Sequence, residues 1–351
     1  MMPQEEKKHK RRVHYSGKYP KKFEEKYKEL QPEKYKDTIE HVIKKGNTPA
    51  GMHISIMVNE ILDFLKIQPG ETGFDATLGY GGHTKAMLQC LKGQGHIYAT
   101  DVDPEESART RKRLEEAGFG EDILTIRLQN FCTIDEIAKE AGGFDFILAD
   151  LGVSSMQIDN PKRGFSFKVD GPLDLRLNQE AGISAAERLA AITKDELAGM
   201  LYENSDEPYC EELAKAITDE IRKGNRIDTT TKLRNIIEKT LDFLPEKEKK
   251  DTIKKTCQRT FQALRIDVNR EFEVLYEFME KLPDALKPGG RAAILTFHSG
   301  EDKLVKKALK EGYRAGIYAD YAKDVIRPSA QECAQNGRAR STKMRWAIKA
   351  E

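Results

Sequence analysis

Short apolar strands alternate with amphipathic helices from Thr72 onward, and this alternation constrains the fold more than any other feature of the chain. Strands are predicted at Thr72–Ala76, His96–Thr100, Ile123–Arg127 and Phe144–Ala149, with helices over residues 83–92, 104–117 and 133–140 between them. Alternation at this spacing is typical of a parallel sheet covered by helices on both faces. We therefore predict an α/β fold with a Rossmann-like, doubly wound sheet.

The alternation stops after Asp150. Residues 151–180 contain many Gly, Pro and Asp and predict a loop, and residues 184–250 have helical periodicity without a clear strand. The pattern then resumes with a long helix at 256–282, a turn at 288–290, a fifth strand at Arg291–Phe297, a helix at 301–311 and a last strand at the sheet edge, Lys343–Ile348. The simplest interpretation is one doubly wound domain, residues 51–160 and 255–351, interrupted by a helical insertion domain, residues 161–254.

Positive charge is concentrated at the two ends of the chain. The net charge is only +1, but residues 1–28 contain ten Lys and Arg against four Glu, and residues 326–351 contain six against two. The residues between them therefore carry a net charge of −9. Basic ends favour a polyanionic partner, because Lys and Arg contacts to phosphates release counterions. For the basic N-terminal extension, residues 1–50, a solvated tail kept soluble by its charge is an equal alternative.

Several classes of protein are excluded by what the sequence lacks. No apolar run approaches the roughly 20 residues needed to cross a bilayer, and the N-terminus has no apolar segment of a secretory signal. The five cysteines are odd in number, far apart and without a C-x-x-C pair, which argues against a disulfide scaffold or a cysteine zinc site. We expect a cytoplasmic protein without membrane contact.

A glycine-rich turn follows the first strand and marks the candidate ligand site. It reads D-A-T-L-G-Y-G-G-H over residues 75–83 and lies at the carboxyl end of the predicted sheet. Folds of this kind bind cofactors there, and glycine lets the backbone approach a ligand closely. Asp101 ends the second strand 22 residues after Gly79, close to the roughly 20-residue offset of an acidic residue that binds a ribose diol.

Asp75 bears on which cofactor the turn binds. A carboxylate just before the glycines would repel a pyrophosphate, but it suits a cofactor that has no phosphate and carries an ammonium group and a sulfonium cation. The spacing also departs from the G-x-G-x-x-G of NAD enzymes. These features favour S-adenosylmethionine over a dinucleotide, and a purely structural turn is the remaining alternative.

Three further positions near strand ends bear on the same pocket. Phe131 follows the third strand, where a side chain can flank an adenine ring, and packing in the core explains it equally well. Asp150 ends the fourth strand, where an acidic residue faces cofactor and substrate unless it caps a helix or turn. Gln157 follows shortly afterward and could reach the pocket.

Longer motifs lie in order over about residues 50–351. They are H-I-S-I-M at 53–57, the glycine-rich turn at 75–83, D-L-G-V-S-S-M-Q-I-D at 150–159, R-G-F-S-F at 163–167, D-G-P-L-D-L-R at 170–176, R-T-F-Q-A-L-R-I-D-V-N at 259–269, F-H-S at 297–299 and N-G-R-A-R-S at 336–341. Together they resemble the motifs of the bacterial 16S ribosomal RNA cytosine-N4 methyltransferases. The run at 259–269 is too long for a chance match.

The resemblance implies a class I S-adenosylmethionine-dependent methyltransferase fold with an insertion that recognises the substrate. It also implies methylation of the exocyclic N4 of a cytosine in 16S ribosomal RNA, decoding-centre cytosine 1402 in standard numbering, within the small ribosomal subunit or a late assembly particle. The family's cofactor contacts fall on Gly81, Gly82, His83, Asp101, Phe131, Asp150 and Gln157. Asp75 and Gly79 of the same turn complete the candidate cofactor site.

The chain departs from the family pattern in three places. The family usually has F-H-S-L-E-D-R, whereas here Gly300 replaces the Leu and Lys303 replaces the Arg. The insertion usually carries G-E-E, and residues 204–207 read N-S-D-E. The basic N-terminal extension is not typical. A paralogous methyltransferase acting on another RNA site is therefore an alternative.

Methylation of the cytosine amine requires positioning more than a strong base. Its lone pair is delocalised into the ring, and its proton becomes acidic only as the new N–C bond forms. Asp150 is the candidate acceptor for N4–H, with Ser154 as a helper. His298, after the fifth strand, could bind the flipped base or a phosphate, although such a histidine more often satisfies a backbone carbonyl.

Candidate RNA contacts come from aromatic and arginine side chains. Phe165 and Phe167 could stack on an extruded base, with loop packing as the commoner explanation. Candidate phosphate contacts, with ordinary salt bridges as the alternative, are Arg176, Arg265, Arg338 and Arg340. No cluster of His, Cys, Asp and Glu has convincing metal spacing, so we predict no required metal.

Two other functions stay open at this point. One is a NAD-dependent oxidoreductase on the same doubly wound sheet. The other is an RNA-binding or ribosome-assembly protein that keeps the fold but has lost activity, which the altered segment at Gly300 and the basic ends motivate. A homodimer is also left open.

Overall fold

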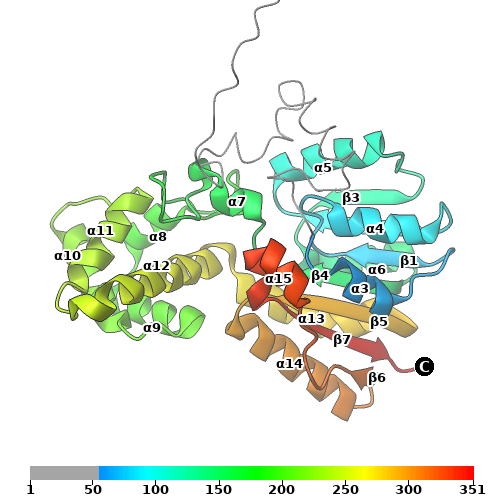
Figure 1. The fold of residues 1–351 in the computed structure, drawn as a ribbon. Helices are drawn as coiled ribbons and strands as arrows, with labels where there is room; N and C mark the ends of the chain where they lie inside the picture. The colour runs from blue at the N-terminus through cyan, green and yellow to red at the C-terminus, as the bar shows by residue number, and fades with distance from the viewer. Residues whose placement is uncertain (1–54) are drawn as a thin grey trace, which may run out of the picture. The chain divides into compact units, whose positions relative to one another are not determined.

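A seven-stranded mixed sheet with helices on both faces organises the computed structural model, which describes residues 55–351 (Figure 1). The strands are β1 (Thr72–Asp75), β2 (His96–Asp101), β3 (Leu124–Leu128), β4 (Phe144–Asp150), β5 (Leu286–Thr296), β6 (Tyr318–Tyr321) and β7 (Lys343–Lys349). Their order is β3-β2-β1-β4-β5-β7-β6, with β1 to β5 parallel and β7 antiparallel to both neighbours. The predicted doubly wound α/β fold is confirmed, and the N-terminal extension lies outside the described residues.

The position predicted for the last strand is wrong. We expected Lys343–Ile348 at the sheet edge, but β7 lies between β5 and β6 and pairs with both. The edge is formed by β6, which the sequence does not predict. Its four residues, Tyr-Ala-Asp-Tyr, give too short a pattern to be distinguished from a loop.

Helices cover each face of the sheet through a separate apolar core. One core contains residues of α6 (Ile134–Ala141), α13 (Glu271–Ala285) and α14 (Ser299–Arg314), and the other contains residues of α3 (Val58–Leu65), α4 (Gly82–Leu91) and α5 (Pro104–Glu116). Neighbouring residues of β4 alternate between the two cores. Ile147 and Ala149 belong to the first, and Phe146 and Leu148 belong to the second. Burial on both sides is expected for a central strand of a parallel sheet.

The long helix predicted at 256–282 is two helices. These are α12 (Glu246–Asn269) and α13, separated at Arg270, whose φ of 52° is left-handed. The side chain of Asn269 accepts a hydrogen bond from the N–H of Leu177 at 2.8 Å and donates to the carbonyl of Leu175 at 2.7 Å. Because the helical periodicity continues across this break, the sequence pattern conceals it.

A helical insertion separates β4 from β5 and has an apolar core of its own. Its helices are α7 (Ser155–Asp159), α8 (Ala185–Ala191), α9 (Lys194–Ser205), α10 (Cys210–Arg222), α11 (Thr230–Thr240) and α12. Leu189, Leu201, Leu213 and Leu233 are fully buried in this core. The predicted insertion is therefore present. Since α12 runs unbroken through residue 254, the domain boundary placed there stays a prediction.

Two short segments near the C-terminus complete the fold. They are α15 (Ala330–Gln335) and the 3-10 turn η4 (Gly337–Ser341), which lie between β6 and β7 in the chain. The carboxylate of Glu332 in α15 accepts a hydrogen bond from the N–H of Met57 at 2.8 Å, which ties this segment to the start of α3. None of the helices in residues 55–351 combines the length and apolar character needed to span a bilayer.

The close approach of β1 and β4 gives a test of this packing. A Cβ added to Gly73 would lie 2.1 Å from the ring of Phe146. We expect Gly73→Ala to lower the free energy of unfolding by about 1–3 kcal/mol in urea denaturation, because neither buried strand has room to move. As a control, Gly199→Ala in α9 meets nothing within 4 Å and should raise that free energy by about 0.5–1 kcal/mol. Equal stabilities of the two variants would contradict this packing.

Candidate active site

A cavity of about 380 Å³ lies at the carboxyl ends of the parallel strands. The segments that follow β1 to β5 all contribute to its wall, together with parts of α12, α13 and η4. The predicted site residues that line it are Gly79, Gly81, Gly82, His83, Asp101, Phe131, Asp150, Ser154, Gln157, Arg265, His298 and Arg338. One cavity thus gathers residues that are more than 250 positions apart in the sequence.

The glycines of the turn after β1 are required by space and by backbone conformation. Gly79 and Gly81 have φ values of 47° and 82°, in the left-handed region that favours glycine. A Cβ on Gly81 would lie 2.6 Å from Cγ2 of Thr110, and one on Gly82 would lie 2.0 Å from Oγ of Ser55. A larger residue at Gly81 or Gly82 would therefore clash with a neighbouring side chain unless the turn moved.

Asp75 supports this turn from below and does not line the cavity. Its side chain is buried and accepts hydrogen bonds from Oγ1 of Thr84 at 2.6 Å and from the N–H of Thr77 at 3.0 Å. Burial raises the pKa of Asp75, although these two hydrogen bonds oppose the shift. The cofactor argument made from Asp75 is therefore misplaced, and other carboxylates supply the negative charge of the cavity wall.

Asp101 is one of those carboxylates. Its Oδ2 accepts a hydrogen bond from the N–H of Gly79 at 2.8 Å, and its Oδ1 accepts one from the N–H of Asp103 at 2.9 Å. Burial raises the pKa of Asp101 to about 7, against the opposing hydrogen bond from Gly79. The group therefore changes charge near neutral pH.

Asp103 joins the end of β2 to the loop after β4. This buried residue caps α5 through the N–H groups of Glu105 and Glu106, both at 3.1 Å. Its other oxygen accepts a hydrogen bond from Nε2 of Gln157 at 2.9 Å and forms an ion pair with Arg163. The sequence patterns do not single out Arg163, because its partner lies 60 residues away in the chain.

His83 and Asp150 form a pair on the cavity wall. Nε2 of His83 lies 3.4 Å from Oδ2 of Asp150, and the N–H of Asp150 donates to Oγ1 of Thr77 at 2.7 Å. Burial by itself lowers the pKa of His83, but the hydrogen bond and charge of Asp150 and the charge of Asp75 raise it above its ordinary value. The Oδ1 atom of Asp150 is buried and has no hydrogen-bond partner among residues 55–351.

Ser154 and Gln157 are engaged in local structure. Oγ of Ser154 accepts from the N–H of Gln157 at 3.1 Å, and Oε1 of Gln157 accepts from the N–H of Ser154 at 2.9 Å. This capping box begins α7. Both residues line the cavity, but a catalytic role for Ser154 stays a prediction.

Phe131 lies at the border between cavity and core. Its ring lines the cavity and meets the ring of Phe278 edge-on, with centroids 5.2 Å apart. The two interpretations of this residue, an adenine neighbour and a core side chain, are therefore compatible.

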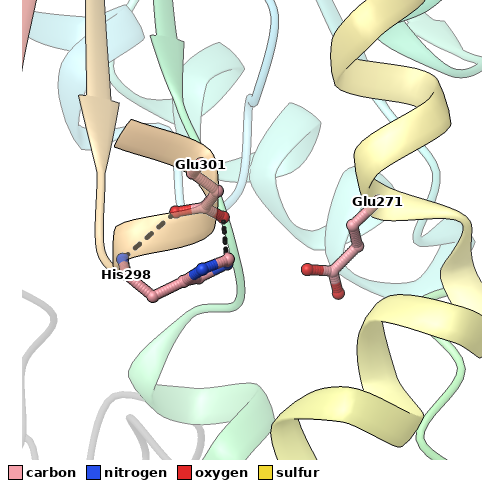
Figure 2. A group of neighbouring side chains, drawn as sticks. All are labelled: Glu271, His298 and Glu301. Carbon is pink, nitrogen blue, oxygen red and sulfur yellow. Dashed lines mark hydrogen bonds and ion pairs between the residues drawn. The ribbon is translucent and has the colours of Figure 1, made fainter. Parts of the chain in front are cut away.

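Four charged residues form what we call the charged cluster: Arg265, Glu271, His298 and Glu301. Arg265 donates from Nε and Nη2 to the two carboxylate oxygens of Glu271, each at 2.8 Å. Nε2 of His298 lies 3.1 Å from Oε1 of Glu301, and Figure 2 shows Glu271 of α13 facing this pair from the opposite side. His298 thus faces a carboxylate rather than the backbone carbonyl considered above.

Contacts within the charged cluster offset the effect of burial on the pKa of Glu301. Burial would raise the pKa of Glu301, but the hydrogen bond and charge of His298, the N–H of Phe297 and the charge of Arg265 hold it below its ordinary value. Possible ligand atoms of Glu271, His298 and Glu301 lie within 4.8 Å of one another. A cation there would compete with the guanidinium of Arg265 for Glu271. That no metal is required stays a prediction.

Several predicted RNA contacts lie outside this cavity. Phe165 is buried in the core of the insertion, and Phe167 packs edge-on against Phe261 with centroids 5.8 Å apart. Arg176 forms two hydrogen bonds with Asp174, at 2.8 and 2.9 Å. The loop that carries Phe165 and Phe167 packs into the insertion, as the alternative explanation expects, and stacking of either ring on an extruded base stays a prediction.

The other two arginines come from the C-terminal segment. Arg338 lines the cavity and donates from Nη2 to Asp159 of α7 at 2.8 Å. Arg340 is exposed on η4 and does not line the cavity. Arg338 therefore joins η4 to α7, while Arg340 faces solvent.

The sequence matches the profile of the MraW methylase family over residues 50–350. The chain belongs to the MraW methylase family. It is 88% identical to ribosomal RNA small subunit methyltransferase H 1 of Agathobacter rectalis, over 99% of each chain. The H 1 protein of Lachnoclostridium phytofermentans is 70% identical, over 97% of this chain and 93% of that protein. The methyltransferase H of Koribacter versatilis is 36% identical, over 85% of this chain and 94% of that protein.

Membership of the MraW methylase family decides two questions left open by the sequence. The chain is a methyltransferase and not an oxidoreductase. Its cofactor is the methyl donor S-adenosylmethionine and not a nicotinamide nucleotide. The alignment with the Agathobacter protein covers 347 residues. The N-terminal extension is therefore shared with that relative.

The cavity of this MraW methylase suits S-adenosylmethionine. The glycine turn presents bare backbone to the cavity, Asp101 offers a carboxylate to a ribose diol, and Phe131 offers a ring face or edge to adenine. Asp150 also lines the wall, and Arg265 is neutralised by Glu271. Four carboxylates line the wall against two guanidinium groups, a balance that suits a cationic donor. The individual contacts stay proposals.

The departure at Gly300 is matched by a neighbouring ring. A Cβ on Gly300 would lie 2.5 Å from Cζ of Phe272 and 3.2 Å from Nδ1 of His298. The ring of Phe272 fills this space, with its centroid 5.7 Å from that of His298. The departure from the family motif therefore leaves no void beside Gly300, which weakens the case for lost activity.

Binding of S-adenosylmethionine should depend on pH through Asp101. Its raised pKa means that the free protein holds a proton there below about pH 7, and an ionised carboxylate accepts both hydrogen bonds of a ribose diol. We expect the affinity, measured by calorimetry, to weaken by up to about tenfold per pH unit below 7. Asp101→Asn should bind weakly and without this dependence. Binding by the unaltered chain that is constant from pH 5.5 to 8 would contradict the assignment.

The pairing of Gly300 with Phe272 predicts a compensated double variant. Gly300→Leu alone should lower methyl transfer at least about tenfold, since misplacing a group next to the reacting atoms by 1 Å can cost more than that. The double variant Gly300→Leu with Phe272→Ala should recover most of the loss. Melting temperatures identify variants that fail to fold. If the double variant is no better than the single one, the two side chains do not share this space.

Proposed function

We propose that this chain transfers the methyl group of S-adenosylmethionine to the exocyclic N4 of a cytosine in 16S ribosomal RNA, the decoding-centre cytosine. Its partner is the small ribosomal subunit or a late assembly particle, in the cytoplasm. The motifs at 150–159 and 259–269 support this substrate, as do the names of the relatives, which are ribosomal RNA small subunit methyltransferases. The observation that carries the chemistry is the carboxylate of Asp150 in the cavity wall, paired there with His83.

Asp150 is placed to accept a hydrogen bond from the amine of the target base. It ends β4 next to the turn after β1, and its other oxygen faces His83. When bound, S-adenosylmethionine supplies an electrophilic methyl group on a sulfonium centre. A hydrogen bond from N4–H to the carboxylate of Asp150 orients the amine and localises its lone pair toward that methyl group. The proton released as the N–C bond forms then has an acceptor within reach.

His83 pairs with this acceptor. Burial opposes the shift, but the hydrogen bond and charge of Asp150 raise the pKa of His83 above its ordinary value, so the imidazolium form is favoured beside the carboxylate. The favourable pairing is present at low pH and is lost as the pH rises through the raised pKa of His83.

The charged cluster forms another part of the wall. His298 and Glu301 lie at the end of β5 and the start of α14, and both line the cavity with Asp150. His298 is the group best placed there to donate a hydrogen bond to a base, because its partner Glu301 orients the ring. We assign it to base binding and leave the acceptor role to Asp150.

Nucleoside mass spectrometry of small-subunit RNA tests the reaction. Cells without the gene should lack N4-methylcytidine at the decoding centre, and the purified chain should restore it on their small subunits in the presence of S-adenosylmethionine. Loss of a methyl group at a different nucleotide would favour the paralogue alternative. No change in any RNA would favour the reading as a protein that has lost activity.

Asp150→Asn separates the two roles considered for Asp150. If Asp150 accepts the N4 proton, kcat at saturating S-adenosylmethionine should fall by about 100-fold or more, while the Kd for the cofactor changes by only a few-fold. The matched control is Ser184→Ala, which removes the cap of α8 away from the cavity and should lower stability by about 1 kcal/mol with little loss of kcat. A variant of Asp150 with normal kcat and a much weaker cofactor Kd would assign it to cofactor binding alone.

A further inference from the structure

A second cavity, of about 540 Å³, lies in the insertion and shares no residue with the first. It is bounded by α11, by the first half of α12 and by the loop that carries Phe167. We call it the basic groove and define it by its cationic residues, which are Lys168, Arg234, Lys249, Lys250 and Lys254.

The basic groove is strongly cationic. Its five Lys and Arg residues stand against two acidic ones, Glu238 and Glu246, so its lining has a formal charge of +3. By contrast, the whole stretch between residues 28 and 326 has a net charge of −9. A local excess of this kind in an acidic region is not a general property of the surface.

Three of the lysines are available to a ligand. Lys249 is paired with Asp242 at 2.6 Å and with Glu246 at 3.2 Å, and Arg234 is paired with Glu238 at 3.3 Å. Lys168, Lys250 and Lys254 are exposed, and no ion pair engages them within the described part of the chain. Their ammonium groups therefore have no carboxylate partner among residues 55–351.

An aromatic ring lies beside these lysines. Phe167 lines the groove and is only partly buried, with its edge against Phe261. The carbonyl of Phe167 accepts a hydrogen bond from Arg234 at 3.4 Å, which holds the loop against α11. An apolar ring next to free lysines offers contacts to both a base and the phosphates of a nucleic acid strand.

The basic groove is connected to the methyl-transfer cavity by continuous structure. The same loop carries Arg163, paired with Asp103, and Leu177, which lines the cavity. Helix α12 runs from Lys250 and Lys254 to Arg265 in the cavity wall. One strand bound at both places would therefore meet a single, connected body.

We propose that the basic groove binds the phosphate backbone of the RNA substrate at nucleotides beside the target cytosine. Lys168, Lys250 and Lys254 contact phosphates, and Phe167 packs against a base or sugar. This proposal rests on the proposed function, since it takes the RNA substrate as given. It moves Phe167 from the methyl-transfer cavity, where the sequence suggested it, to a separate RNA contact.

The test replaces the three exposed lysines of the groove and compares this variant with one that loses the same number of lysines outside the groove. The groove variant is Lys168→Ala with Lys250→Ala and Lys254→Ala. The control is Lys239→Ala with Lys247→Ala and Lys255→Ala, which removes three exposed lysines of α11 and α12 that do not line the groove. The probe is purified small ribosomal subunits that lack the methyl group, titrated onto the fluorescently labelled full chain at several salt concentrations.

The groove variant should bind these subunits at least about tenfold more weakly at 0.1 M salt, and its plot of log affinity against log salt should be shallower by about two. Its KM for subunits should rise with kcat nearly unchanged, and its melting temperature and affinity for S-adenosylmethionine should match the unaltered chain. The control should bind within about twofold of the unaltered chain.

Two results would overturn the proposal. One is a groove variant with unchanged affinity and salt dependence while the unaltered chain still methylates the subunits, which leaves the proposed function intact. The other is an equal loss in the groove variant and the control, which would mean non-specific attraction or an acidic protein partner. A third result separates the two proposals. If the unaltered chain transfers no methyl group but the groove variant still binds the subunits more weakly, RNA binding by the groove is supported and the proposed function is wrong.

Discussion

The buried carboxylate of Asp103 is the contact on which the arrangement of the site depends. It caps α5, accepts a hydrogen bond from Gln157 and pairs with Arg163, so it holds the loop after β4 to the end of β2. A buried carboxylate without a counter-charge is costly. Removing one partner of a buried ion pair therefore destabilises a protein more than replacing both partners with apolar residues. The insertion is therefore fixed to the sheet at the point where the donor is expected to bind.

Much of the fold follows from local patterns in the sequence. The alternation of Phe146 and Leu148 with Ile147 and Ala149 across β4 is an ordinary consequence of burial on both faces, and it identifies a central strand. The break at Arg270 and the edge strand β6 do not follow in this way. The first is imposed by tertiary hydrogen bonds of Asn269, and the second is too short to have a period.

The site residues also fall into two groups, those that sequence patterns identify and those that they do not. Glycines and strand-end carboxylates such as Asp101 and Asp150 are found from sequence, because chain topology alone brings strand ends together. The charged cluster and the pairing of Arg163 with Asp103 need distances across the fold. Asp75 shows the opposite error: its place in the motif was correct, but its side chain lies beneath the turn rather than in the cavity.

The unbroken course of α12 has a mechanical consequence. Lys254 and Arg265 are eleven residues apart on one helix, which at about 1.5 Å per residue sets an interval of about 16 Å along its axis. Such an interval cannot be adjusted by hinge motion within the helix. An RNA strand that binds at both places must itself span this distance. The length of a helix would then help decide which RNA conformations are accepted.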